Sequence, residues 1–270
     1  MEKRAVCIGI NDYPGYDSDL AGCVNDAHDW AAVLGKRGYT VKTILNKAAT
    51  GDAIRNAIHS LVMDAKKGDS VVIQYSGHGS FVPDLDGDEP DGRDECICPY
   101  DIDRNGPIID DELCEAYSQW RPGVRGLMIS DSCHSGTVSR FAPITTPPSA
   151  KGRHAPRRTV RFLPPSMYLS RSEASKLAAC VLRRAGKPKQ YGALLMAGCQ
   201  DVEYSYDAYF QGRPNGAFSF VAIRALSKLG PNATYSDWFK EIRKVLPSRQ
   251  YPQSPNLYGS ESMKRWKVFA

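Results

Sequence analysis

Two short polar motifs in this chain combine residue types that could carry out nucleophilic catalysis. The first is YSGHG at 75–79, and the second is DSCHSG at 131–136. A cysteine attacks as its thiolate, which forms at neutral pH when a base stands nearby. Cys133 and His78 could form such a pair. His134 is the less suitable candidate for the base, because neighbouring side chains on an extended segment point apart. The glycines on both sides of His78 would let the backbone approach a ligand closely.

The hydrophobic pattern predicts a scaffold that brings these motifs together. Apolar runs typical of buried strands occupy residues 4–11, 39–45, 70–75, 124–130 and 192–199, and the tail 265–269 could add an edge strand. Helices are predicted over 19–36, 50–67, 110–120, 173–184, 216–229 and 234–246. Alternating strands and helices indicate a largely parallel sheet covered on both faces. Functional groups gather at the carboxyl ends of such strands, so we expect both motifs at one sheet edge.

The composition argues against several classes of protein. No apolar run approaches the roughly 18 residues that a membrane span needs, and Asn11 and Asp12 interrupt any signal-peptide core. The eight cysteines lack zinc-ligand spacing, so we expect reduced thiols in a cytoplasmic protein. Residues 139–190 hold twelve Lys/Arg and seven prolines, without the interleaved stacking aromatics that single-strand binders use. That pattern predicts a cleavable linker and no nucleic-acid or membrane partner.

The paired motifs resemble those of the metacaspases and their prokaryotic relatives among the caspase-like peptidases. Position 133 follows position 78 by 55 residues, near the roughly 50 of the caspase arrangement. The likeness covers nearly the whole chain and includes AVCIGIN, GCVNDA, DLDGDEPDGRDECICPYD, RFLPP and GCQDVEYSYD…GRPNGAFSF. It implies an α/β caspase-like three-layer sandwich with a mostly parallel six-stranded sheet. Within this one domain, 1–138 would be the large-subunit-like region, 139–190 the linker and 191–270 the small-subunit-like region.

The resemblance also implies roles for the residues of the two motifs. Cys133 would attack the scissile carbonyl, and His78 would assist thiolate formation and protonate the leaving amine. The backbone N–H groups of Gly79 and Cys133 would form the oxyanion hole. The cysteine does not stand in the Q-A-C-x-G context of true caspases, so specificity for aspartate is not expected.

Acidic residues near the cysteine point to basic substrates. Asp131 lies two residues before Cys133, and a carboxylate there attracts Arg or Lys. The resemblance implies a substrate pocket at Cys23, Asp26, Ser76 and Asp131. The alternative is that Asp26 caps its helix and Asp131 accepts backbone hydrogen bonds. We expect a monomeric endopeptidase that acts on proteins or peptides with Arg or Lys at the cleaved position.

The acidic segment of residues 80–112 suits calcium, which binds six to eight oxygen ligands. Asp84-x-Asp86-x-Asp88 begins like an EF-hand loop, but Glu89 stands where glycine is needed. The resemblance instead implies that Asp94, Asp110 and Asp111 hold an activating Ca²⁺. A solvated acidic loop without metal is the alternative.

The basic linker offers the enzyme its own substrate sites. Self-cleavage is expected between about 140 and 190, because proline-rich flexible segments are readily cut, and the fragments should remain associated. The exposed candidates are Arg153, Arg157, Arg158, Arg161, Arg171, Arg183 and Arg184.

Two other hypotheses compete with this one. The first is a related clan peptidase of different specificity, such as an asparagine-specific or separase-like enzyme, although Asp26 and Asp131 argue against asparagine. The second is a non-catalytic caspase-like interaction module. That hypothesis predicts a missing histidine or cysteine, and the chain has both.

Overall fold

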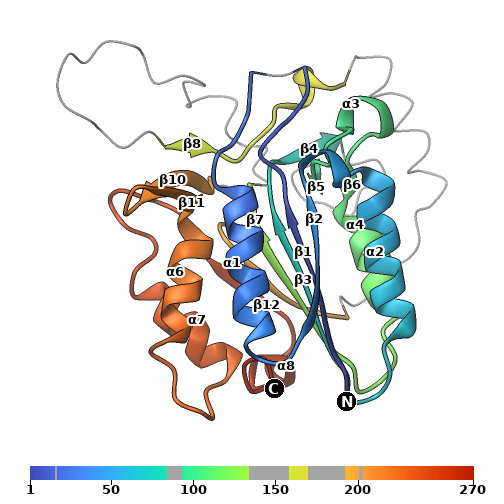
Figure 1. Ribbon diagram of the computed structural model, residues 1–270, viewed down its shortest axis with the longest axis vertical. Helices are drawn as coiled ribbons and strands as arrows, with labels where there is room; N and C mark the ends of the chain where they lie inside the picture. The colour runs from blue at the N-terminus through green and yellow to red at the C-terminus, as the bar shows by residue number, and fades with distance from the viewer. Residues whose placement is uncertain (16, 84–92, 134–157, 170–191, 201–202) are drawn as a thin grey trace.

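The computed structural model describes residues 1–15, 17–83, 93–133, 158–169, 192–200 and 203–270. At its centre lies a six-stranded sheet in the order β12-β9-β7-β3-β1-β2 (Figure 1). All neighbours pair in parallel except β12, which runs antiparallel to β9. In the described part of the chain, no helix has the length and apolar character to span a membrane.

The central strands follow the apolar runs of the sequence. Their bounds are β1 (Lys3–Gly9), β2 (Thr40–Leu45), β3 (Ser70–Ser76), β7 (Arg125–Asp131), β9 (Leu194–Ala197) and β12 (Asn256–Tyr258). Every residue of β3 is buried, as expected for a parallel strand covered on both faces. The register pairs Ser76 with Asp131, so β3 and β7 end side by side.

Helices cover both faces of this sheet, as Figure 1 shows. On one face lie α1 (Cys23–Gly35), α6 (Ala217–Leu226) and α7 (Tyr235–Arg243), and on the other α2 (Gly51–Asp64) and α4 (Asp110–Ser118). Trp30 of α1 meets Trp238 of α7 edge to face at 5.9 Å between ring centroids. The Thr50 hydroxyl caps α2 by accepting the Ala53 N–H, which helps to fix where that helix begins.

Two small antiparallel sheets lie near the carboxyl ends of β3 and β7 (Figure 1). One contains β4 (Gly79–Pro83), β5 (Arg93–Ile97) and β6 (Ile108–Ile109), and the other β8 (Thr159–Val160), β10 (Tyr206–Phe210) and β11 (Arg213–Gly216). Among the described residues, the remaining short helices are α3 (Ile102–Asn105), α8 (Glu261–Lys264) and the 3₁₀ turns Asn46–Ala48 and Pro165–Met167. Because β4 begins directly after His78, the first small sheet extends from the YSGHG motif.

The structure confirms the predicted α/β fold with a mostly parallel six-stranded sheet and helices on both faces. The prediction for the tail is wrong, because the edge strand is β12 and not residues 265–269. The Phe269 ring instead packs against Tyr235 and Trp238 in the core, so the apolar tail is buried away from the sheet edge. The helix predicted over 173–184 lies outside the described residues.

Candidate active site

The two polar motifs meet where β3 and β7 leave the sheet. His78 and Cys133 are both buried, with 1% and 0% of their surface exposed. Gly79 lets the backbone after His78 lie against that of Cys133, because a Cβ at position 79 would lie 1.8 Å from the Cys133 carbonyl oxygen. Only glycine fits there. His134, the rejected alternative base, lies outside the described residues.

The Cys133 sulfur is held by the backbone of Ser205, which directly precedes β10. The Ser205 N–H donates to Sγ at 2.7 Å, and the thiol can donate a hydrogen bond to the Ser205 carbonyl oxygen at 3.3 Å. An N–H directed at the sulfur stabilises negative charge there. Strand β10 therefore helps to orient the thiol, although it is distant from Cys133 in sequence.

The His78 ring is fixed by contacts on two sides. Nε2 lies 2.6 Å from the Ser18 carbonyl oxygen, and the ring centroid lies 4.6 Å from that of Tyr13. Nδ1 is buried and has no hydrogen-bond partner among the described residues. Burial lowers the pKa of His78 to about 4, although the Ser18 backbone opposes the shift. The imidazole is therefore neutral at pH 7, and with Nε2 donating to Ser18 it keeps a basic nitrogen at Nδ1.

A buried arginine occupies the expected substrate pocket. Arg161 Nη2 lies 2.7 Å from Asp26 and 2.8 Å from Asp207. Arg161 Nη1 lies 3.2 Å from Asp131. Burial alone would lower the pKa of Arg161, but Asp131 and the other carboxylates raise it well above its usual value. Three carboxylates around one guanidinium make this a pocket for a cation.

The burial of Arg161 overturns one prediction about the linker. Arg161 was expected to be exposed, yet its side chain has no exposed surface, because three carboxylates hold the guanidinium. Arg158 is exposed, and its guanidinium lies 5.2 Å from the centroid of the Tyr206 ring. The other candidate arginines, Arg153, Arg157, Arg171, Arg183 and Arg184, lie outside the described residues.

The backbone of Arg161 also forms hydrogen bonds within the site. Its carbonyl oxygen accepts the Gly79 N–H at 3.0 Å and the Cys133 N–H at 3.2 Å. These are the two groups expected to form the oxyanion hole. The Arg161 N–H donates to the Ser205 carbonyl at 3.0 Å, and β8 pairs antiparallel with β10 just before it. The chain thus passes through the site as an extended strand with one carbonyl between the two N–H donors.

The structure brings together only part of the expected pocket. The guanidinium contacts Asp26 and Asp131. Burial raises the pKa of Cys23, and the positive charge of Arg161 acts in the opposite direction, as expected for a neighbouring residue. The hydroxyl of Ser76 instead accepts from Gln74 at 2.8 Å. Within the described ranges, no hydrogen bond joins Ser76 to Arg161.

The alternative roles of the two aspartates can also be compared with the structure. Asp26 is not the cap of α1, whose N-cap is Gly22 without a side-chain hydrogen bond. Its carboxylate accepts the Gly216 N–H at 3.0 Å, and burial raises its pKa to about 7 against the attraction of Arg161. Asp131 does accept a backbone hydrogen bond, from Ser219 at 2.9 Å. It therefore both contacts the guanidinium and fixes the start of α6.

Asp207 of β10 is a pocket residue that the sequence analysis missed. Besides Arg161, its carboxylate accepts the N–H groups of Ala21 and Gly22 at 2.9 and 3.0 Å. These bonds tie the start of α1 to β10. The only available signal was its position in the family-like stretch GCQDVEYSYD.

The residues expected to bind calcium lie around the first small sheet. Asp94 is a buried residue of β5, and Asp110 and Asp111 stand in the first turn of α4, directly after β6. Their carboxylate oxygens are suitable ligands for Ca²⁺. In the part of the chain that the structure describes, no three acidic, histidine or cysteine side chains converge as a metal site. Residues 84–92 of the acidic segment are outside that part.

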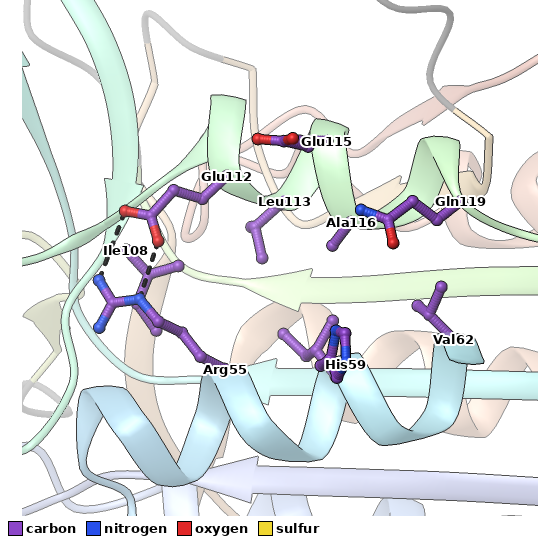
Figure 2. Close-up of a pocket in the computed structure, with 10 residues that line it drawn as sticks. Arg55, His59, Val62, Ile108, Glu112, Leu113, Glu115, Ala116 and Gln119 are labelled. Atoms are coloured by element: carbon purple, nitrogen blue, oxygen red, sulfur yellow. Dashed lines mark hydrogen bonds and ion pairs between the residues drawn. The ribbon is translucent and has the colours of Figure 1, made fainter. Parts of the chain in front are cut away.

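A separate hollow lies between α2 and α4 and shares no residue with the Arg161 pocket. Figure 2 shows the ion pair of Arg55 with Glu112 at one end of it, where N and O are 2.8 Å apart. The exposed His59 projects from α2 beside it. The residues that line this hollow include no cysteine or serine, so it offers no thiol or hydroxyl nucleophile. His59 is instead a useful control position for experiments on His78.

The chain is similar to known proteins in sequence and structure. The family model for the metacaspase, peptidase C14 domain, matches residues 3–141. Metacaspase-1 of Cryptococcus neoformans var. neoformans is 35% identical over 97% of this chain, and metacaspase-1A of Aspergillus oryzae is 34% identical over 94%. The chain spans 63% and 67% of the length of these two relatives. The crystal structure of protein GSU0716 from Geobacter sulfurreducens matches with a TM-score of 0.77 and 30% identity, over 100% of this chain and 98% of that one.

Proposed function

The chain belongs to the metacaspase family of cysteine peptidases, and on that premise we propose that it is an endopeptidase that cuts after arginine or lysine. The observation that supports this specificity best is the position of Arg161. Its guanidinium contacts three carboxylates while its carbonyl oxygen accepts the Gly79 and Cys133 N–H groups. A substrate residue bound in the same way would present its own carbonyl to Cys133.

The chemistry that we propose uses four groups of this site. The Cys133 thiolate attacks the scissile carbonyl carbon, and the oxygen gains negative charge between the N–H groups of Gly79 and Cys133. Each such donor contributes about 3 kcal/mol in other enzymes. His78 takes the thiol proton and delivers it to the leaving amine. Water then hydrolyses the thioester and restores the thiol.

A panel of fluorogenic peptides with Arg, Lys, Asn or Asp at the cleaved position tests this proposal. We expect kcat/KM for Arg and Lys to exceed that for Asp by about 100-fold or more, because like charges at a binding site cost several kcal/mol. Cys133→Ala should abolish hydrolysis, while Cys114→Ala, a partly buried cysteine on α4, should not. Equal rates for Asn or Asp peptides would refute the specificity.

We also propose that Ca²⁺ binds at Asp94, Asp110 and Asp111 and activates the enzyme. The metal would supply positive charge that holds β5 and the start of α4 together. Binding to the folded state alone stabilises it by about 2.7 kcal/mol at 100 times Kd. We therefore expect Ca²⁺ to raise the melting temperature of the Cys133→Ala variant, in which self-cleavage does not interfere.

The matched variants for calcium are Asp111→Asn and Asp52→Asn. Both aspartates stand in the first turn of a helix, Asp111 in α4 and Asp52 in α2. The melting shift should disappear with Asp111→Asn and persist with Asp52→Asn. If Ca²⁺ does not change the melting temperature of the Cys133→Ala variant with all three aspartates present, the solvated acidic loop without metal is favoured instead.

Self-processing within residues 139–190 is a further part of the proposal. A cut there would separate β7 from β9, but these neighbours are joined by parallel pairing from Leu127–Leu194 to Ser130–Ala197. The two fragments would therefore stay together in one sheet.

A further inference from the structure

We infer that residues 158–163 lie in the cleft as the enzyme's own substrate, that Arg161–Phe162 is the bond it cuts in itself, and that Phe81 and Tyr204 form the pocket for the next residue. This inference rests on the proposed function. It names one bond within the linker and a subsite beyond that bond.

The residues before the bond are held as a substrate strand would be. Val160 pairs with Tyr206 in antiparallel register, and the Arg161 N–H donates to the Ser205 carbonyl at 3.0 Å. Ser205 also contacts the Cys133 sulfur through its N–H. The same residue therefore holds both the strand and the thiol, while the Arg161 carbonyl accepts the Cys133 N–H.

The residues after the bond are also held by hydrogen bonds to the site. The Leu163 N–H donates to the Gly79 carbonyl at 3.0 Å, and the Ser80 hydroxyl donates to the Leu163 carbonyl at 2.6 Å. The Leu163 side chain is fully buried. A simple arginine anchor would not require ordered pairing on both sides of its carbonyl, whereas a bond positioned for cleavage does.

Phe162 occupies an aromatic pocket directly after the bond. Its ring stacks on Phe81 at 6.1 Å between centroids and tilts against Tyr204 at 6.5 Å. The Arg93 guanidinium covers the Phe81 ring at 4.5 Å from its centroid. Aromatic pairs in these arrangements add about 0.5–1.5 kcal/mol beyond the area they bury. This pocket should therefore favour an aromatic residue after the cut in any substrate.

The occupied cleft also makes the uncut chain latent. An incoming arginine must displace Arg161 from three buried carboxylates, and a tethered competitor acts at an effective concentration in the millimolar range. Cutting reduces this advantage, because Arg161 then loses its covalent link to the paired residues Phe162 and Leu163 and is tethered only through the residues before it. Activity on external substrates should thus rise as the bond is cut.

The cut itself follows the chemistry of an ordinary turnover. Cys133 Sγ bonds to the Arg161 carbonyl carbon, the bond to the Phe162 nitrogen breaks, and His78 gives that nitrogen the thiol proton. Water then attacks the thioester, which leaves an Arg161 carboxylate and a free Cys133 thiol. The products are two chains, the second of which begins Phe-Leu-Pro-Pro.

N-terminal sequencing of the incubated protein, with and without Ca²⁺, tests the position of the cut. We expect a fragment that begins at Phe162 in the unsubstituted chain and in Arg161→Lys, and none in Cys133→Ala or Arg161→Gln. Hydrolysis of an arginine peptide should accelerate in step with that fragment. The Arg161→Lys variant keeps the buried charge, so it answers the question even if Arg161→Gln is destabilised.

The outcomes separate this inference from the proposed function. Hydrolysis of the arginine peptide without a Phe162 terminus would overturn the inference and leave the proposed function intact. Failure to cut the peptide as well as the chain would overturn both. A full rate on the peptide while residues 161 and 162 are still joined would contradict the latency.

Substrate peptides test the pocket after the cut. We expect kcat/KM for a Val-Arg-Phe peptide to exceed that for a Val-Arg-Asp peptide by about tenfold, as for other differences within an apolar pocket. Phe81→Ala should bring this ratio close to one, while His59→Ala on the far helix should keep it. An unchanged ratio in Phe81→Ala would refute the assignment of the pocket.

Discussion

Replacing His78 with alanine is expected to lower kcat/KM for an arginine peptide by about 10²–10⁴-fold, the usual contribution of a general acid–base group. The imidazole is neutral and keeps Nδ1 without a partner among the described residues, which suits a group that must accept the thiol proton. Steady-state kinetics on the purified variant measures this loss. The matched control is His59→Ala, because His59 is an exposed histidine on α2.

The pH dependence gives a second readout for the same residue. In the uncut chain, burial lowers the pKa of His78 to about 4, so the basic form persists to about pH 5. The rate of self-cleavage should therefore stay nearly constant from pH 7 to 5 and fall towards pH 4. Once the cleft is open to water, the acid limb of peptide hydrolysis should move up towards the ordinary value of about 6.5.

The same shift predicts a change in stability with pH. The unfolded chain binds a proton at His78 below about pH 6.5, whereas the folded chain does so only below about 4. The free energy of unfolding should therefore decrease as the pH falls through this window, by about 3 kcal/mol at most. Denaturant titrations of Cys133→Ala with and without His78→Ala measure this contribution.

In the chain that keeps Cys133, full activity of the His78→Ala variant would contradict the proposed dyad.

The central layers of the fold could be predicted because their sequence pattern is local. A parallel strand buried on both faces, such as β3, is a continuous apolar run, and α2 places Ile54, Ile58 and Val62 on one face. The carboxyl ends of neighbouring parallel strands must meet, which is why both motifs could be expected at one sheet edge. Each of these inferences depends only on patterns within short stretches of the sequence.

The small sheets around the site could not be predicted in the same way. Strand β8 has only two residues, and its pairing with β10 depends on contacts between distant segments. A basic, proline-rich composition indicates a loop, so Arg161 was expected in solvent. Its burial depends on Asp207, whose role is visible only once β10 lies beside α1. The charge of the pocket could be predicted, but not its present occupant.

Replacing Asp131 with asparagine is expected to lower kcat/KM for arginine peptides by about 10²–10³-fold and to destabilise the uncut chain. Truncating one member of a buried charge pair typically costs about 2–5 kcal/mol in binding. Asp131 contacts the guanidinium at 3.2 Å and accepts the Ser219 N–H at 2.9 Å, and neither carboxylate nor guanidinium is exposed. Asparagine retains the shape but places an amide N–H₂ where one carboxylate oxygen accepted from Ser205 or Ser219, so the variant removes the charge and one hydrogen bond.

Stability should fall by about 3–5 kcal/mol in Asp131→Asn, because the ion pair with Arg161 is fully buried and the amide also replaces one hydrogen-bond acceptor. The matched control is Asp29→Asn, whose carboxylate pairs with the partly exposed Arg213. Exposed pairs of that kind contribute about 1 kcal/mol or less. Denaturant titration in the Cys133→Ala background compares the two without self-cleavage.

A double variant separates the charge pair from a general weakening of the fold. If Asp131 acts through Arg161, the losses of Asp131→Asn and Arg161→Gln should not add, because each change alone already removes the ion pair between them. The double variant should lose about 1–3 kcal/mol less than the sum of the single variants, as for other groups in direct contact. Additive losses would mean that Asp131 acts only through its other partners, the Ser219 N–H and the Ser205 hydroxyl. The acidic pocket would then stabilise the fold and would not select the substrate.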